Sequence, residues 1–131
     1  MGSSKTKAFA ANNLGVAYAD KKDYENAERW FNEAISYDLR SHEAYYHLGV
    51  IYLIKGNSKN SFLDLQKAEE YLKKTLEIKA SYGRAHLILA EVYMGLGDKE
   101  KAREHAKKAY EKGLIEPFDE KAKAILEMDK D

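Results

Sequence analysis

The chain has 131 residues, of which 44% are hydrophobic and 34% are charged, so it has enough apolar side chains for a packed core and enough charge for a polar surface. Because 22 basic side chains balance 22 acidic ones, no overall field favours nucleic acid or an anionic membrane as a partner. The sequence contains no cysteine, which excludes disulfide bonds, thiolate catalysis and zinc sites built on cysteine.

Helix-forming residues dominate the composition, and the alternating apolar and polar runs typical of strands are missing. The single proline and the eight glycines provide few breaks, so the predicted fold class is all-α. The longest apolar stretches, such as residues 48–54, are too short to span a bilayer, and no apolar signal-peptide core follows Met1. We therefore expect a cytoplasmic protein without membrane insertion, although the sequence leaves open that a leader was removed.

The first predicted helices follow a short tail. Residues 1–7 are expected to form this tail, and its Met-Gly-Ser-Ser start is typical of an expression remnant. Residues 8–41 then predict a pair of helices, because Leu14 and Tyr18 are four residues apart and share one helix face. The polar residues Lys22 and Asp23 are expected to end the first helix and cap the second.

The same spacing returns twice along the chain. Leu14 is matched by Leu48 after 34 residues and by Leu89 after a further 41, and a tyrosine follows each leucine four residues later. The intervals differ by seven residues, so the second unit is longer than the first. The sequence therefore predicts three helix pairs in one register.

The seven extra residues lie between Gly56 and Ala68. A polar turn at Gly56 and a polar loop after it are expected to precede a helix from about Ser61 to Lys79. Seven residues are about two helical turns, so the insertion lengthens this helix without rotating its core face. A flexible loop is the alternative interpretation of the insertion.

The last predicted element is a helix over residues 117–128, in which Ala122, Ile125 and Leu126 form an apolar stripe. Pro117 suits the first turn of such a helix. A stack of helix pairs needs a terminal helix with one polar face, so residues 115–131 are interpreted as a capping helix and tail.

The three helix pairs resemble the tetratricopeptide repeat, with repeats at residues 8–41, 42–82 and 83–114. The resemblance implies an α-solenoid of antiparallel helix pairs, in which neighbouring pairs complete one another's core. The chain departs from the family pattern at two kinds of position. The usual early tryptophan is replaced by Ala11, Tyr45 and His86, and the usual closing proline is replaced by Leu39, Ala80 and Leu114.

In stacks of this family the first helix of each pair lines a concave groove. The resemblance implies that the groove residues here are Asn12, Val16, Tyr46, His47, Val50, Leu53, Arg84, Leu87, Glu91 and Met94, with Phe9 and Ala19 beside them. Most of this set is apolar, and exposed apolar patches tend to be interaction sites. The centre of the groove is expected at Tyr46, Val50 and Leu87. The alternative interpretation is that some of these side chains are simply core.

One subgroup of the family grips acidic chaperone tails with a clamp of lysines, asparagines and an arginine. The corresponding positions here are Asn12, Val16, His47, Arg84 and Ile88. Only Arg84 has a suitable charge, and a bare carboxylate would lose its ion pairs against apolar walls. The sequence therefore favours an apolar peptide or an amphipathic helix as the ligand.

No catalytic motif, cofactor site or metal site is predicted. His42 and His47 are five residues apart, about 140° around a helix, so they cannot chelate one metal as histidines four apart do. His86 and His105 are isolated in the sequence, and the repeated tyrosines are better explained by packing than by nucleic-acid stacking. No enzymatic activity and no nucleic-acid binding are expected.

Two functional hypotheses remain open at this point. The first is a non-enzymatic scaffold that binds a protein or peptide in its groove. The second is a self-associating assembly module, in which the groove or the terminal helix forms a homo-oligomer interface.

Overall fold

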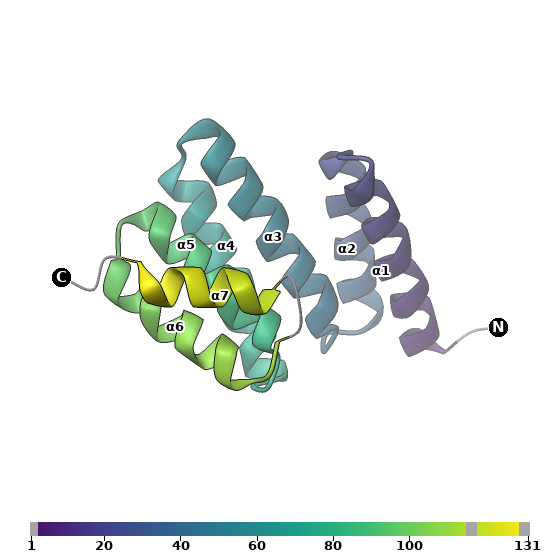
Figure 1. Ribbon diagram of the computed structural model, residues 1–131. Helices are drawn as coiled ribbons and strands as arrows, with labels where there is room; N and C mark the ends of the chain where they lie inside the picture. The colour runs from purple at the N-terminus through teal and green to yellow at the C-terminus, as the bar shows by residue number, and fades with distance from the viewer. Residues whose placement is uncertain (1–2, 115–117, 129–131) are drawn as a thin grey trace.

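The computed structural model describes residues 3–114 and 118–128, which form seven α-helices (Figure 1). The helices are α1 (Ser4–Asp20), α2 (Tyr24–Tyr37), α3 (His42–Lys59), α4 (Phe62–Ile78), α5 (Gly83–Leu96), α6 (Lys99–Glu111) and α7 (Phe118–Glu127). Consecutive helices form the pairs α1/α2, α3/α4 and α5/α6, and α7 packs against α6 and α5. The fold is therefore the all-helical stack that the sequence predicts.

Short polar turns separate the two helices of each pair. The N-caps Asp23, Ser61 and Asp98 each accept a hydrogen bond from a backbone N–H in the first turn of the second helix, at 3.3, 3.2 and 3.0 Å. The residue just before each cap, at Lys22, Asn60 and Gly97, has a positive φ of 63°, 53° and 83°. This left-handed residue stops the first helix and turns the chain.

Two glycines allow the paired helices to approach closely. A Cβ atom added at Gly15 would lie 2.5 Å from Phe31 Cε1, and one added at Gly49 would lie 2.6 Å from Leu72 Cγ. Phe31 and Leu72 are both fully buried, so neither side chain can move aside without disturbing the core. These two contacts fix the spacing within the first and second helix pairs.

The buried residues form two clusters, which meet at α3. The smaller one joins the first helix pair to one face of α3, and its members are Ala11, Ala27, Phe31, Ala34, Ala44, Leu48 and Ile51. The larger one contains the rest of the second pair, the third pair and the buried residues of α7. Within residues 3–114 and 118–128, α3 and the half-buried Tyr71 connect the first pair to the remainder of the core.

Equivalent tyrosines tie each helix pair to the one before it. The Tyr52 hydroxyl donates to Glu28 at 2.6 Å, and the Tyr93 hydroxyl donates to Glu69 at 2.5 Å, across the same sequence interval of 24 residues. At the third junction Arg103 occupies the place of the glutamate and donates to the Met128 carbonyl oxygen at 2.7 Å. At the last junction the second helix of the pair therefore provides the donor, whereas at the first two junctions it provides the acceptor.

The insertion in the second pair is shared between its two helices. The predicted helix from Ser61 to Lys79 is confirmed as α4, with Ser61 as its N-cap and Lys79 as its C-cap. The predicted turn and loop after Gly56 are wrong, because α3 continues through residues 57–59 and ends at the left-handed Asn60. Gly56 instead faces Leu65, whose Cγ would be 2.7 Å from an added Cβ. The α3/α4 hairpin therefore extends beyond its neighbours (Figure 1).

The two ends of the chain differ from the sequence expectation in one respect. Helix α1 begins at Ser4, and Ser3 caps it by accepting from the Thr6 N–H at 3.1 Å, so residues 4–7 are helical rather than a tail. The predicted C-terminal helix is present as α7, while the role assigned to Pro117 lies outside the described residues. Within residues 3–114 and 118–128, none of the helices is both long enough and apolar enough to cross a membrane.

Candidate functional site

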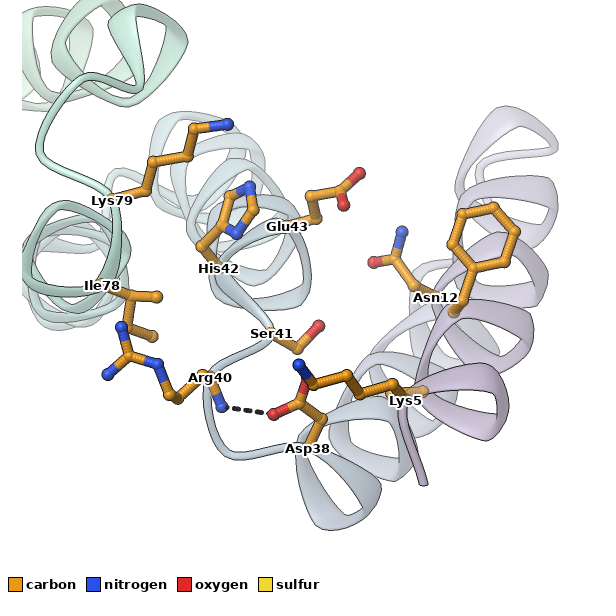
Figure 2. A pocket seen from close by; sticks show the side chains of 11 residues that line it. Lys5, Asn12, Asp38, Arg40, Ser41, His42, Glu43, Ile78 and Lys79 are labelled. Carbon is orange, nitrogen blue, oxygen red and sulfur yellow. Dashed lines mark hydrogen bonds between the residues drawn. The ribbon is translucent and has the colours of Figure 1, made fainter. Parts of the chain in front are cut away.

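Two cavities follow one another along α1 and α3, and we call them together the α1–α3 groove. The polar cavity, of about 410 Å³, lies where the first half of α1 faces the start of α3 (Figure 2). Its lining consists of Lys5, Ala8, Phe9, Asn12, Asp38, Arg40, Ser41, His42, Glu43, Ile78 and Lys79. The apolar cavity, of about 230 Å³, lies further along the same two helices and is lined by Val16, Ala19, Asp20, Tyr24, Phe31, His47, Val50, Ile51 and Ile54.

The groove exists because α1 and α3 hardly touch. Helix α1 packs mainly on α2, and α2 provides most of the contact with α3. In Figure 1 the first helix pair accordingly stands to one side of α3. The next first helix, α5, packs more closely on α3, and a cavity lined by Gly56, Asn57 and Gly95 lies near the C-terminal ends of these two helices.

Aliphatic side chains and one uncharged histidine surround the apolar cavity. Burial lowers the pKa of His47 to about 4, and the positive charge of Arg84 acts in the same direction. The His47 ring stacks on Phe31, with ring centroids 5.0 Å apart. Asp20 is the only carboxylate that lines this cavity, so its walls suit an apolar side chain.

The polar cavity contains an amide that lacks a hydrogen bond. Asn12 is 5% exposed, and its Oδ1 atom finds no donor among the described residues. Across the cavity, Ser41 is the N-cap of α3, but its side chain makes no capping hydrogen bond. Burial lowers the pKa of His42, so this ring is also uncharged at neutral pH.

The structure divides the predicted groove residues into accessible and buried sets. Val16, His47 and Val50 line the apolar cavity, and Asn12 lines the polar cavity. Tyr46, Leu53 and Leu87 are buried, so the expectation that Tyr46 and Leu87 form the exposed centre of the groove is wrong. Tyr46 packs edge-on against His47 and Tyr82, at 5.1 and 5.3 Å between ring centroids, because α5 closes over this part of α3.

The part of the predicted groove on α5 is covered by α7. Arg84 lies over the Phe118 ring, 4.7 Å from its centroid. Burial raises the pKa of Glu91, against the opposing charge of Lys121 on α7, and Met94 packs against the larger core cluster. The accessible part of the predicted groove therefore lies on α1 and α3.

Several lining residues were not predicted from the sequence. Ile54 follows Val50 by four residues on the same face of α3, so helical spacing would have found it. Residues 38–43 and 78–79 approach α1 only through the packing of the helix pairs, and no sequence signal marks them. The polar cavity therefore could not be predicted from the sequence alone.

His86 and His105, which are isolated in the sequence, are neighbours in the structure. Their Nδ1 atoms are 3.0 Å apart, and the His105 ring also stacks on Tyr93. Across the described part of the chain, no group of three or more His, Cys, Asp or Glu side chains is arranged to hold a metal ion. The two stacked rings pack α5 against α6.

Comparisons with known proteins agree with this architecture. Family models described as tetratricopeptide repeat match residues 8–40, 42–82 and 64–111. No curated protein sequence gives a significant match to the chain. Among solved structures, the Arabidopsis OM64 TPR domain is similar with a TM-score of 0.80 at 19% identity, covering 94% of this chain and 93% of that chain.

Two further similar structures were solved with bound peptides. The first TPR of Spaghetti, bound to the HSP90 peptide SRMEEVD, has a TM-score of 0.78 at 18% identity and covers 93% of this chain and 89% of that chain. The Yersinia enterocolitica secretion chaperone SycD, in complex with a peptide of the translocator YopD, has a TM-score of 0.75 at 16% identity and covers 90% of this chain and 88% of that chain. At these identities the likeness concerns the fold.

Proposed function

The chain belongs to the tetratricopeptide repeat family, and on that premise we propose that it is a non-enzymatic scaffold that binds a peptide segment of another protein in the α1–α3 groove. The observation that carries this proposal is the apolar cavity between Val16, Val50 and Ile54, which lies open beside an uncharged His47. Domains of this family are typically binding modules rather than catalysts.

The dimensions of the groove favour an extended peptide over an amphipathic helix. A helix with its side chains is about 10–12 Å across, which is too wide for a cavity of about 230 Å³ between two neighbouring helices. An extended chain can instead place single side chains into successive cavities. The similar structures of Spaghetti and SycD, each solved with a peptide, support a peptide ligand as a class.

The charge of the groove argues against an acidic tail like the one bound by Spaghetti. Of the positions that hold the carboxylate clamp in that subgroup, Val16 lines the apolar cavity, Ile88 is buried and His47 is uncharged. A carboxylate at these positions would lose hydration without gaining ion pairs. We therefore expect recognition through an apolar anchor.

The test is a selection of random nine-residue peptides, displayed on phage, against the immobilised chain. Ile54, which is 37% exposed at the cavity, is changed to serine, and the control is Leu63→Ser on α4, which removes an apolar side chain that is 78% exposed outside the groove. We expect Ile54→Ser to weaken a selected peptide about tenfold, the cost of losing one buried aliphatic contact, and Leu63→Ser to leave it unchanged.

Equal binding by both variants would place the ligand outside the groove. Failure to select any peptide would contradict the scaffold proposal. Sedimentation of the purified chain covers the alternative of self-association: a dimer that Ile54→Ser dissociates would make the groove an interface between two copies.

A further inference from the structure

The unpaired Asn12 amide oxygen is the feature of the polar cavity that most needs a partner. A buried carbonyl oxygen without a donor destabilises the fold, and such groups are uncommon in native structures. Asn12 is fixed on α1 and lines the cavity with its side chain, which points toward α3 in Figure 2. The Oδ1 atom is buried as the side chain stands, and a ligand reaches it after rotation about the terminal torsion, which is soft. A bound donor would therefore satisfy a group that the free chain leaves unsatisfied.

Two further acceptors face Asn12 from the start of α3. Figure 2 shows Ser41 and Glu43 directed into the space between the two helices. The Ser41 hydroxyl is not used for capping, and Glu43 forms no ion pair with any residue that the structure describes. An amide oxygen, a hydroxyl and a carboxylate thus line one side of the same cavity.

The cationic side chains that line the cavity are directed away from Asn12. Lys5 points toward Asp38 in Figure 2, and the Lys79 ammonium lies over the Tyr82 ring, 5.7 Å from its centroid. Arg40 is exposed and turns away from Asn12 in the same view. These three side chains are exposed, as is Glu43, so solvent screens all four charges, whereas the Asn12 oxygen is buried.

The positive end of the α3 dipole and the exposed side chains of Lys5, Arg40 and Lys79 favour an anion. Glu43 in the first turn of α3 offsets the dipole. An anion would also lie beside the lone pairs of Asn12 Oδ1 and the Glu43 carboxylate, which repel it. The buried oxygen of Asn12 needs a donor, and a cationic donor is also attracted by Glu43.

We propose that the polar cavity receives a lysine or arginine side chain of the bound peptide, which donates to Asn12, Ser41 and Glu43 while an apolar side chain of the same peptide fills the apolar cavity. This inference rests on the proposed function, because it specifies which peptides the α1–α3 groove selects. It assigns the preference of the groove to a basic residue combined with an aliphatic one.

The spacing of the two peptide side chains follows from the helix that they both contact. From Asn12 to Val16, the first residue of α1 that lines the apolar cavity, the rise along α1 is about 6 Å at 1.5 Å per residue. An extended chain rises about 3.3 Å per residue and directs every second side chain to the same face. The basic and the apolar residue are therefore two positions apart, about 6.6 Å.

The experiment is the random-peptide selection against the intact chain, read by sequencing the retained peptides. We expect lysine or arginine to be enriched two positions from an aliphatic residue. A selected peptide is then measured by fluorescence anisotropy against Glu43→Gln and Asn12→Leu, with Asn13→Leu as the matched control, since Asn13 is exposed and adjacent. Both test variants should bind about tenfold more weakly, as loss of a charge-assisted hydrogen bond predicts, and the control should not change.

Each contrary result has its own meaning. Enrichment of aliphatic residues alone, or no effect of Glu43→Gln, overturns the inference and leaves the scaffold proposal standing. Enrichment of aspartate or glutamate also overturns it and makes the start of α3 an anion site. Retention of no peptide contradicts the inference together with the proposed function. Glu43→Gln alters an exposed side chain, so circular dichroism should show it folded like the parent chain.

Discussion

His86 of α5 and His105 of α6 form the one contact between imidazole rings that joins two helices in the described part of the chain. Their Nδ1 atoms are 3.0 Å apart, so one nitrogen must donate and the other accept. Burial lowers the pKa of His86 to about 4, and the charges of His105, Lys108 and Lys112 act in the same direction. Burial likewise lowers the pKa of His105, where Glu104 opposes the shift. Both rings are therefore neutral at pH 7.

The stability of the chain should depend on pH through His86. Its folded pKa lies below its unfolded value, so the unfolded chain binds more protons and stability is lost as the pH falls from about 6.5 towards 4. For a shift of this size we expect His86 to remove about 2 kcal/mol of unfolding free energy between pH 7 and pH 5. Urea unfolding at the two pH values should show a smaller loss of unfolding free energy in His86→Leu than in the parent chain. Equal losses in the two proteins would show that His86 is not the group responsible.

At the scale of single residues, the repeat pattern predicted which positions correspond between helix pairs but not what each side chain contacts. Asn12 was placed in the groove by its register, yet its lack of a donor follows only from the packing of α1 on its neighbours. Leu87 shares its register with Asn12 and Tyr46, and all three side chains are buried. Val16 and Val50, which line the apolar cavity, lie four positions later in their helices.

The hairpin of α3 and α4 shows how a helix pair absorbs extra residues. Its helices have 18 and 17 residues, compared with 14 and 13 in the α5/α6 pair. Extending both helices by about one turn keeps the apolar faces in register, since 3.6 residues make one turn. The sequence misled here because Gly56-Asn57 is a common turn signal, whereas Gly56 serves the contact with Leu65.

The helical state of residues 57–59 can be tested with proline. Ser58→Pro removes a backbone donor inside the last turn of α3 and should lower the unfolding free energy by about 3 kcal/mol. Ser58→Ala, the matched control, should leave stability within about 0.5 kcal/mol, because Ser58 is exposed. Thermal or urea unfolding gives both values. If the proline variant is as stable as the control, the segment is the polar loop that the sequence suggested.

Across the whole molecule, the first helix pair is less firmly attached than the others. It shares with the rest the small core cluster at α3, and the α1–α3 groove occupies much of the remaining boundary. The hydrogen bond of Tyr52 to Glu28, supported by Lys55 at 3.0 Å, is the main polar link across this boundary. Burial opposes ionisation of Glu28, but these two donors outweigh it and lower its pKa.

Native-state hydrogen exchange should resolve this difference. We expect amides of α1 and α2 to exchange through a partial opening, at lower free energy than those of α4 and α5. Tyr52→Phe should raise exchange in α1 and α2 about tenfold, because a hydrogen bond to a charged group contributes about 1.5–3 kcal/mol, part of which Lys55 retains. Tyr93→Phe removes the equivalent bond at the next junction and should not affect α1 and α2 selectively. Uniform protection across all helices would contradict a separable first pair.

At the scale of the whole molecule, the sequence predicted the stack of helix pairs but not the extent of the α1–α3 groove. Helix order, pairing and the terminal helix follow from periodicities that are local to each repeat. The extent of the groove depends instead on how far each first helix stands from the next, which is set by side chains from several helices together. No sequence pattern therefore predicts that residues 38–43 and 78–79 line a cavity together with α1.

The exchange of an acceptor for a donor at Arg103 affects how a further repeat could be attached to the chain. A glutamate at this point of a second helix accepts from a tyrosine of the following first helix, as at Glu28 and Glu69. Arg103 offers donors instead and is matched to the carbonyl at the end of α7. A tyrosine of a fourth repeat grafted after α6 could only accept from Arg103, whereas Tyr52 and Tyr93 donate to a carboxylate. Lengthening the protein by design would therefore begin with Arg103→Glu, which restores the acceptor of the earlier junctions.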